Sequence, residues 1–128
     1  MRNGWKRGIT AWGPAVVYMA AIFTLSAQSK LPSPPGILGW DKLHHVLAYL
    51  VLGLLLYRAC VISPITRTSP YRLSLLLGAL YGALDEYHQG FVPGRDMSAL
   101  DWLANVLGLI AALILMRILE MRRENGGQ

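Results

Sequence analysis

Hydrophobic residues in this chain fall into four long runs, separated by shorter segments rich in proline, glycine and charge. The runs cover residues 9–27, 43–62, 71–87 and 99–119. A helix needs about 20 largely apolar residues to cross the hydrocarbon core of a bilayer, and the runs are close to that length. The pattern therefore predicts an all-α polytopic membrane protein with four transmembrane helices.

The segments between the runs predict how the helices are arranged. The first connection, residues 28–40, is the longest and contains Pro32, Pro34, Pro35, Gly36 and Gly39, a composition that breaks helices. The second and third connections, residues 63–70 and 90–98, are short. Short connections make successive helices antiparallel neighbours, which predicts an up-down-up-down bundle. Little chain is left over, so we expect a single domain over residues 1–128.

Composition agrees with the membrane class. Of the 128 residues, 54% are hydrophobic and 15% are charged, and the mean hydropathy is +0.39. A soluble domain of this length could not bury so many apolar side chains. Cys60 is the only cysteine, which excludes an intramolecular disulfide.

Basic residues are distributed unevenly between the two ends of the predicted bundle. Nine of the 12 flank the cytoplasmic ends of a four-span arrangement: Arg2, Lys6, Arg7, Arg58, Arg67, Arg72, Arg117, Arg122 and Arg123. Lys30, Lys42 and Arg95 fall at the other end. The positive-inside rule then places both termini in the cytoplasm. Because the basic residues flank the apolar runs and share no soluble surface, we expect membrane lipids as partners and no nucleic acid.

The first run admits a second interpretation. A basic start, an apolar run and the small residues Ser26 and Ala27 also compose a cleaved signal peptide. The run is long for a signal sequence, so we favour a retained helix.

Polar and ionisable residues gather at the three helix ends that are predicted to face outward. At 100° per residue, those on each helix form a narrow stripe, which on the third and fourth helices continues inward as small residues such as Gly82 and Gly108. Ionisable groups at membrane depth are costly and by default mark a functional site. The predicted site comprises Asp41, Lys42, His45 and Tyr49 from the second helix, Asp85, Glu86, His88 and Gln89 from the third, Arg95 from the loop that follows, and Asp101 and Asn105 from the fourth.

Three blocks of the sequence, read together, resemble the VanZ-like family of small integral membrane proteins. They are Asp41-Lys42-x-x-His45-x-x-x-Tyr49, Asp85-Glu86-x-His88-Gln89-x-Phe91-x-x-Gly94-Arg95 and Asp101-x-x-x-Asn105-x-x-Gly108, with Ser26-Ala27-Gln28 at the end of the first run. The resemblance covers roughly residues 20–115 and does not include His44. It implies a bacterial cytoplasmic-membrane protein of the cell envelope. The family's namesake is linked to resistance to teicoplanin, a glycopeptide that binds cell-wall precursors. The resemblance thus implies a cellular location and a biological process, and it does not imply a particular chemical reaction.

Three kinds of chemistry remain open for the predicted site. The first is recognition or hydrolysis of a lipid phosphate head group, with Asp85, His88, Arg95 and His45 as candidate catalytic residues. Arg95 supplies a bidentate fork for phosphate oxygens, Lys42 a point charge, and a histidine can act as nucleophile or proton shuttle. The remaining site residues, Asp41, Lys42, Tyr49, Glu86, Gln89, Asp101 and Asn105, are predicted to bind or support the ligand.

The second kind is a metal site built from His45, Asp85, Glu86, His88 or Asp101, although no HxxxH or HxxE spacing supports it and no ligand set is assigned. The third is non-enzymatic: the groups bind an envelope ligand, or simply join the helices by hydrogen bonds. We favour an outward-facing site that binds a lipid-linked cell-wall intermediate or a glycopeptide and contributes to glycopeptide tolerance. The alternative is a membrane-embedded hydrolase or phosphotransferase that acts on lipid phosphate head groups, with or without a metal ion.

Overall fold

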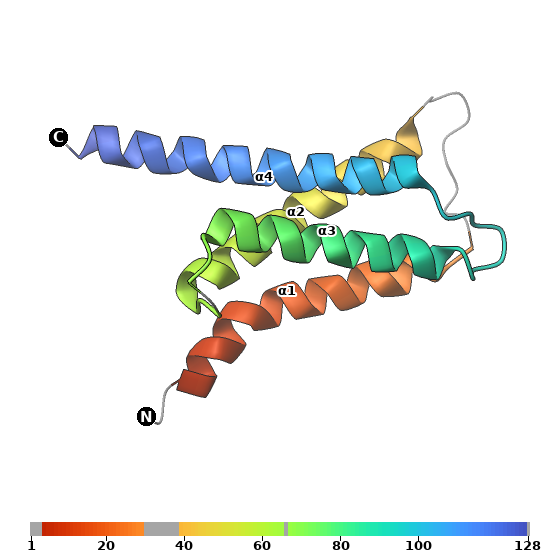
Figure 1. Ribbon diagram of the computed structural model, residues 1–128, viewed down its shortest axis with the longest axis horizontal. Helices are drawn as coiled ribbons and strands as arrows, with labels where there is room; N and C mark the ends of the chain where they lie inside the picture. The colour runs from red at the N-terminus through yellow and green to blue at the C-terminus, as the bar shows by residue number, and fades with distance from the viewer. Residues whose placement is uncertain (1–3, 30–38, 66, 128) are drawn as a thin grey trace.

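The protein is all-α, as predicted. The structure is a computed structural model that describes residues 4–29, 39–65 and 67–127. It contains four helices: α1 (Gly4–Ser26), α2 (Trp40–Ile62), α3 (Pro70–Gln89) and α4 (Ala99–Gly126). Successive helices run in alternating directions, and the chain's two ends lie at the same end of the bundle (Figure 1). Most of the predicted first connection lies outside the described residues.

The helix boundaries follow local signals in the sequence. Pro70 occupies the first turn of α3, where its missing N–H is not needed. Ser98 caps α4 by accepting a hydrogen bond from the backbone N–H of Asp101 at 3.2 Å. Both α1 and α4 extend beyond the predicted apolar runs, to Gly4 and to Gly126. Hydropathy marks only the apolar span, whereas lysine, arginine and glutamate are good helix formers and continue the helix.

Helix α2 lies at the centre of the bundle and packs most extensively against α4. Glycines allow this close approach. A Cβ on Gly108 would overlap the carbonyl oxygen of Val46 and lie 2.9 Å from the backbone nitrogen of Leu50. On α3, a Cβ on Gly78 would lie 2.5 Å from the Leu109 side chain. The small residues at these positions therefore serve packing within the bundle.

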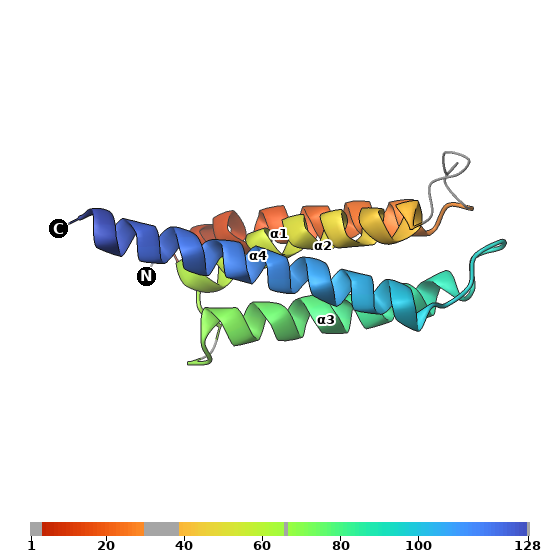
Figure 2. The ribbon, with the colours of Figure 1, turned by 90° about the horizontal axis from the view of Figure 1, so that it is seen from above.

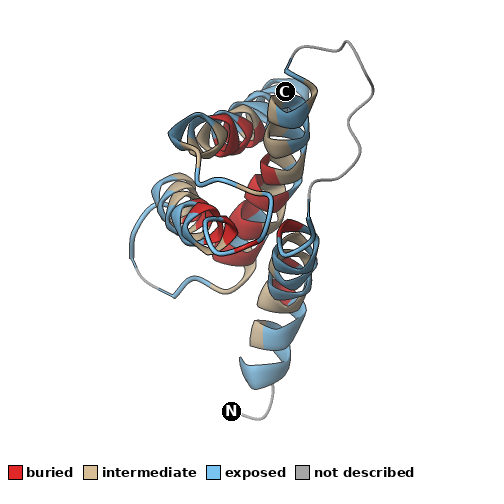
Figure 3. Ribbon diagram, turned by 90° about the vertical axis from the view of Figure 1, so that its right-hand side faces the viewer, coloured by how far each residue is buried: buried red, intermediate tan, exposed pale blue. Residues whose placement is uncertain are grey.

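Helix α1 is the least buried of the four (Figure 3). It packs against α2 and meets α3 over a short stretch, and its described residues do not contact α4. Seen from above, α1 and α2 lie on one side and α3 on the other (Figure 2). The Tyr81 hydroxyl donates to the Met19 carbonyl at 2.6 Å and so ties α3 to α1.

Arg58 compensates for a proline inside α1. Pro14 has no N–H, so the carbonyl of Thr10 lacks its helical donor. The Arg58 Nη1 atom of α2 lies 3.2 Å from that carbonyl oxygen and 3.4 Å from the carbonyl oxygen of Ala11. A carbonyl without a donor is costly in a lipid environment, so this contact stabilises both the kink-prone turn and the α1–α2 interface.

At the end of the bundle that carries the termini, Glu120 of α4 joins two other helices. Its carboxylate oxygens accept hydrogen bonds from the hydroxyls of Tyr57 on α2 and Tyr71 on α3. The two tyrosine rings lie 4.8 Å apart, centroid to centroid. The sequence pattern did not predict this contact.

The surface is strongly apolar. Val17 on α1, Leu84 on α3 and Leu107 on α4 are 71%, 66% and 60% exposed, as expected for side chains that meet lipid tails. Helices α1, α2 and α4 are long and apolar enough to cross a membrane, with mean hydropathies of 1.5, 2.0 and 2.1 in their most apolar windows. Of the four predicted spans, three therefore have the length and composition that a membrane span needs. Helix α3 does not meet the same criterion, and it carries three charged residues: Arg72, Asp85 and Glu86.

Candidate functional site

Polar side chains converge at the end of the bundle opposite the termini. The end of α1, the start of α2, the end of α3 and the start of α4 meet there (Figure 1). The alternating helix directions bring these four ends together although they are far apart in the sequence. The side chains form two groups, which join different sets of helices.

The first group, the Asp85 network, joins α1 to α3. The Ser26 hydroxyl donates to Asp85 Oδ1 at 2.6 Å, and Gln89 Nε2 donates to Asp85 Oδ2 at 3.1 Å. Arg95 Nη1 in turn donates to Gln89 Oε1 at 3.1 Å, and Arg95 Nε donates to the Gln28 carbonyl at 2.8 Å. Asp85 and Gln89 are each only 3% exposed. Both carboxylate oxygens of Asp85 are therefore held by donors.

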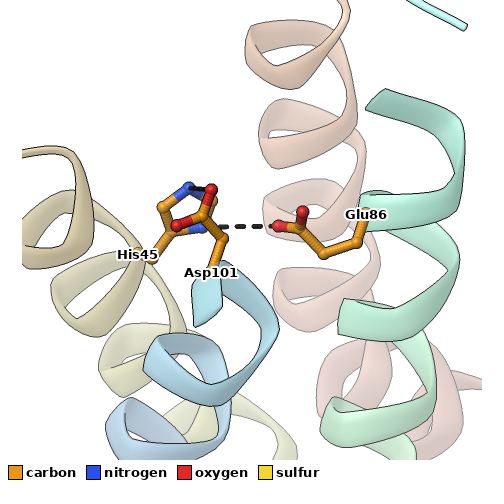
Figure 4. A group of neighbouring side chains, drawn as sticks. All are labelled: His45, Glu86 and Asp101. Carbon is orange, nitrogen blue, oxygen red and sulfur yellow. Dashed lines mark ion pairs between the residues drawn. The ribbon is translucent and has the colours of Figure 1, made fainter. Parts of the chain in front are cut away.

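The second group, the His45 cluster, joins α2, α3 and α4. The His45 ring lies between two carboxylates (Figure 4): Nδ1 is 3.8 Å from Glu86 Oε1, and Nε2 is 3.8 Å from Asp101 Oδ2. Nδ1 also lies 2.9 Å from Asn105 Oδ1. Lys42 pairs with Asp101 and, at 2.7 Å, with Asp41. Among the described residues, His45, Glu86 and Asp101 form a group that could hold a metal ion.

A cavity of about 140 Å³ lies beside both groups. The apolar wall of the cavity consists of Ile22, Leu25 and Ala48. The polar wall consists of Ser26, His44, His45, Tyr49, Asp85, Gln89 and Arg95. An apolar side next to a few converging polar groups is typical of a small-molecule site.

Four buried side-chain atoms at this end have no hydrogen-bond partner among the described residues. They are the Tyr49 hydroxyl, Glu86 Oε1, His88 Nε2 and Asn105 Nδ2. Buried polar groups are nearly always paired in folded proteins, so unpaired ones need an explanation. A bound ligand, ion or water could supply the missing partners.

Comparison with known protein families identifies the chain. The family model described as VanZ/LLP1 matches residues 6–120. The chain belongs to the VanZ/LLP1 family. This confirms the family that the three sequence blocks indicated. No curated protein and no solved structure matches the chain.

The VanZ/LLP1 match spans most of α1 and α4 and all of α2 and α3, and so includes the Asp85 network and the His45 cluster. Membership in this family and the three apolar helices together indicate a membrane protein. The match does not itself assign a role to any residue.

The structure brings together most, but not all, of the predicted site residues of this VanZ/LLP1 chain. His88 stacks on Phe23 of α1, with ring centroids 4.3 Å apart, and does not line the cavity. The side chain of Asp41 is 56% exposed and pairs with Lys42. Glu86 follows Asp85 in the sequence but belongs to the His45 cluster and not to the Asp85 network. It is 3% exposed and accepts a hydrogen bond from the backbone N–H of Ser98 at 3.2 Å.

Some residues at the site were not predicted to belong to it. Ser26 donates to Asp85, and the Gln28 carbonyl holds Arg95. The signal for Ser26 was present in the sequence, as a hydroxyl at the end of an apolar run within a family block. His44 also lines the cavity, although it lies outside the family blocks, and its ring contacts Trp40 edge-on at 5.0 Å.

Proposed function

We propose that this VanZ/LLP1 protein is an integral protein of the bacterial cytoplasmic membrane with both termini in the cytoplasm. Support comes from the excess of basic residues at the end that carries the termini. In this orientation α3 crosses the membrane beside the other helices as a fourth span, and the cavity opens toward the outer side. In this arrangement residues 1–128 form a single transmembrane domain.

We further propose that the cavity binds the polar head group of a lipid-linked cell-wall intermediate. One observation carries this proposal: the cavity has an apolar wall from α1, and it is also lined by Tyr49. The Tyr49 hydroxyl is buried and has no hydrogen-bond partner among the described residues. A lipid head group at the membrane surface needs both: apolar contact for the start of its chain and hydrogen bonds for its oxygens. Tyr49 can donate a hydrogen bond to such an oxygen.

Arg95 suits the same ligand. It lines the cavity, and the two bonds to Gln28 and Gln89 use only two of its five N–H donors. Guanidinium donors bind phosphate oxygens strongly and in a fixed geometry. Asp85 also lines the cavity, but its oxygens already accept hydrogen bonds, which moderates its repulsion of an anion.

The size of the cavity limits what it can enclose. A cavity of about 150 Å³ in another protein holds one benzene molecule, and this one is about 140 Å³. It can enclose a phosphate or a part of one sugar, and because it is partly open, a larger ligand could extend out of it. We propose that a contribution to glycopeptide tolerance acts through the lipid-linked intermediate.

One observation favours an enzymatic alternative, hydrolysis of a lipid phosphate. His45 lines the cavity, and its Nε2 faces Asp101 Oδ2. In such a reaction His45 accepts a proton from the water that attacks phosphorus and returns it to the leaving-group oxygen as the phosphorus–oxygen bond breaks.

A growth assay combined with a product assay tests both possibilities. The wild-type chain and the variants Arg95→Ala and Asp85→Asn are expressed in a glycopeptide-susceptible bacterium. The proposal expects the wild type to raise teicoplanin tolerance and both variants to lose the effect while inserting normally. Purified protein incubated with undecaprenyl pyrophosphate releases phosphate only if the enzymatic alternative holds. Full tolerance with both variants would contradict a role for the cavity.

A further inference from the structure

We propose that His45, Glu86 and Asp101 bind one divalent metal ion, with zinc as the best-suited metal. The three side chains converge from α2, α3 and α4 (Figure 4), and one ligand atom from each lies within 4.8 Å of the others. An imidazole nitrogen combined with carboxylate oxygens is a common ligand set for zinc. The inference does not rest on the proposed head-group binding.

The hydrogen bond between His45 and Asn105 leaves the other ring nitrogen of His45, Nε2, as an acceptor that faces the Asp101 carboxylate. Asn105 Oδ1, 2.9 Å from Nδ1, is an acceptor, so this contact favours the neutral tautomer that carries its proton on Nδ1. Nε2 then presents a lone pair to Asp101 Oδ2 at 3.8 Å. Two acceptors that face each other repel unless a positive charge lies between them.

Glu86 provides an independent indication. Its Oε2 accepts from the Ser98 backbone N–H, while Oε1 faces His45 and has no hydrogen-bond partner among the described residues. The residue is only 3% exposed. A buried carboxylate oxygen without a partner carries a large desolvation cost. Lys42 already pairs with Asp101, so Glu86 is the carboxylate that lacks a compensating charge, and a cation bound beside His45 would supply it.

Each of the three residues also makes a second contact that orients its side chain, as metal ligands usually do. Asn105 contacts the ring of His45, Ser98 holds Glu86, and Lys42 takes the second oxygen of Asp101. Such outer contacts fix the orientation of ligands and are typical of metal sites. Zinc–ligand bonds of about 2.0–2.2 Å require the three side chains to close in slightly from the separations observed.

Metal binding by purified protein tests the inference. The full chain, in detergent and stripped with a chelator, is titrated with zinc and separately with cobalt, whose visible absorption reports the ligand geometry. We expect one ion per chain. His45→Ala and Glu86→Gln should weaken binding by at least about tenfold, the lower range for disturbed metal sites. The matched controls Glu124→Gln, at an exposed position of α4, and Cys60→Ser should bind as the wild type does.

The isosteric Glu86→Gln change and circular dichroism of each variant separate lost binding from lost folding. The inference is overturned if the stripped wild type takes up no stoichiometric metal. It is also overturned if folded His45→Ala and Glu86→Gln proteins bind zinc as tightly as Glu124→Gln does. A bound ion would also occupy the lone pair that the hydrolytic alternative assigns to His45 as a base, so a positive result counts against that role.

Discussion

The Ser26 hydroxyl donates a 2.6 Å hydrogen bond to Asp85, and this bond fixes the end of α1 against α3. Elsewhere these two helices meet only briefly. Ser26 also lines the cavity. The bond therefore contributes both to the position of the most exposed helix and to the polar wall of the candidate site.

Replacing Ser26 with alanine should destabilise the bundle. The change removes one of the two side-chain donors to Asp85, a 3% exposed carboxylate. Hydrogen bonds to charged groups contribute about 1.5–3 kcal/mol. We expect a loss of that size in the free energy of unfolding, measured in mixed detergent micelles.

Thr24→Ala is the matched control for Ser26→Ala. Thr24 lies one half-turn earlier, and its hydroxyl donates to the Ala20 carbonyl of its own helix at 2.8 Å. This change should alter the unfolding free energy by much less. Equal effects of the two changes would mean that the Ser26–Asp85 bond has no special importance.

Arg58 and Pro14 should be energetically coupled. Arg58→Met removes the donor that reaches the Thr10 carbonyl, so it should cost about 1 kcal/mol, in the range of interhelical hydrogen bonds in membrane proteins. Pro14→Ala restores a backbone N–H for that carbonyl. In this background the cost of Arg58→Met should fall, and a double-mutant cycle measures the difference. Strict additivity would argue against compensation.

Gly108→Ala should disrupt the contact between α2 and α4. The new Cβ would overlap the Val46 carbonyl oxygen, a backbone atom that cannot rotate away. Overpacking costs about 1–3 kcal/mol and occasionally more, and we expect the upper end of this range or loss of folded protein. Gly13→Ala, at a helical glycine with no atom within 4 Å of a Cβ, should be neutral or slightly stabilising. The comparison uses thermal unfolding in detergent.

Periodicity predicted much of this structure. The stripe of Gly82, Asp85 and Gln89 on α3 is buried as its 100° spacing indicated, and so are Asn105 and Gly108 on α4. A helix face follows from spacing alone, because the geometry of the α-helix is fixed. The family blocks also marked Asp85, Gln89, Asn105 and Gly108, but not Gly82.

Periodicity could not predict which side chains pair across helices. Asp85 and Glu86 are adjacent in the sequence, yet one faces Ser26 of α1 and the other faces His45 of α2. That division depends on how far each helix is rotated within the bundle. For the same reason the sequence could not show that His88, a predicted site residue, stacks on Phe23 of α1 and does not line the cavity. The contact of Glu120 with two tyrosines likewise arises only in the folded bundle.

Cysteine labelling tests the proposed orientation. In a Cys60→Ser background, Asp96→Cys places a thiol in the exposed loop after α3, and Asn125→Cys places one near the end of α4. Gly94 is less suitable because its φ of +79° disfavours other residues. A membrane-impermeant maleimide should label position 96 in intact cells and position 125 only after lysis. The reverse pattern would place the cavity on the cytoplasmic side.

A larger side chain in the wall of the cavity should weaken ligand binding. Ala48 forms part of the apolar wall, and Ala48→Leu adds three methyl-sized carbons without a change in charge. The variant should fold normally, because Ala48 is only half-buried, and it should bind lipid head groups more weakly. Leu47→Ala, an exposed neighbour outside the cavity, should leave binding unchanged.

Equilibrium binding of undecaprenyl phosphate to the purified chain in nanodiscs tests the central claim most directly. The account predicts saturable binding by the wild type, a loss of at least about tenfold in affinity for Arg95→Gln, and no loss for Arg122→Gln, a charge-matched change far from the cavity. Equal affinities for all three proteins, or no saturable binding by the wild type, would contradict a head-group site at Arg95.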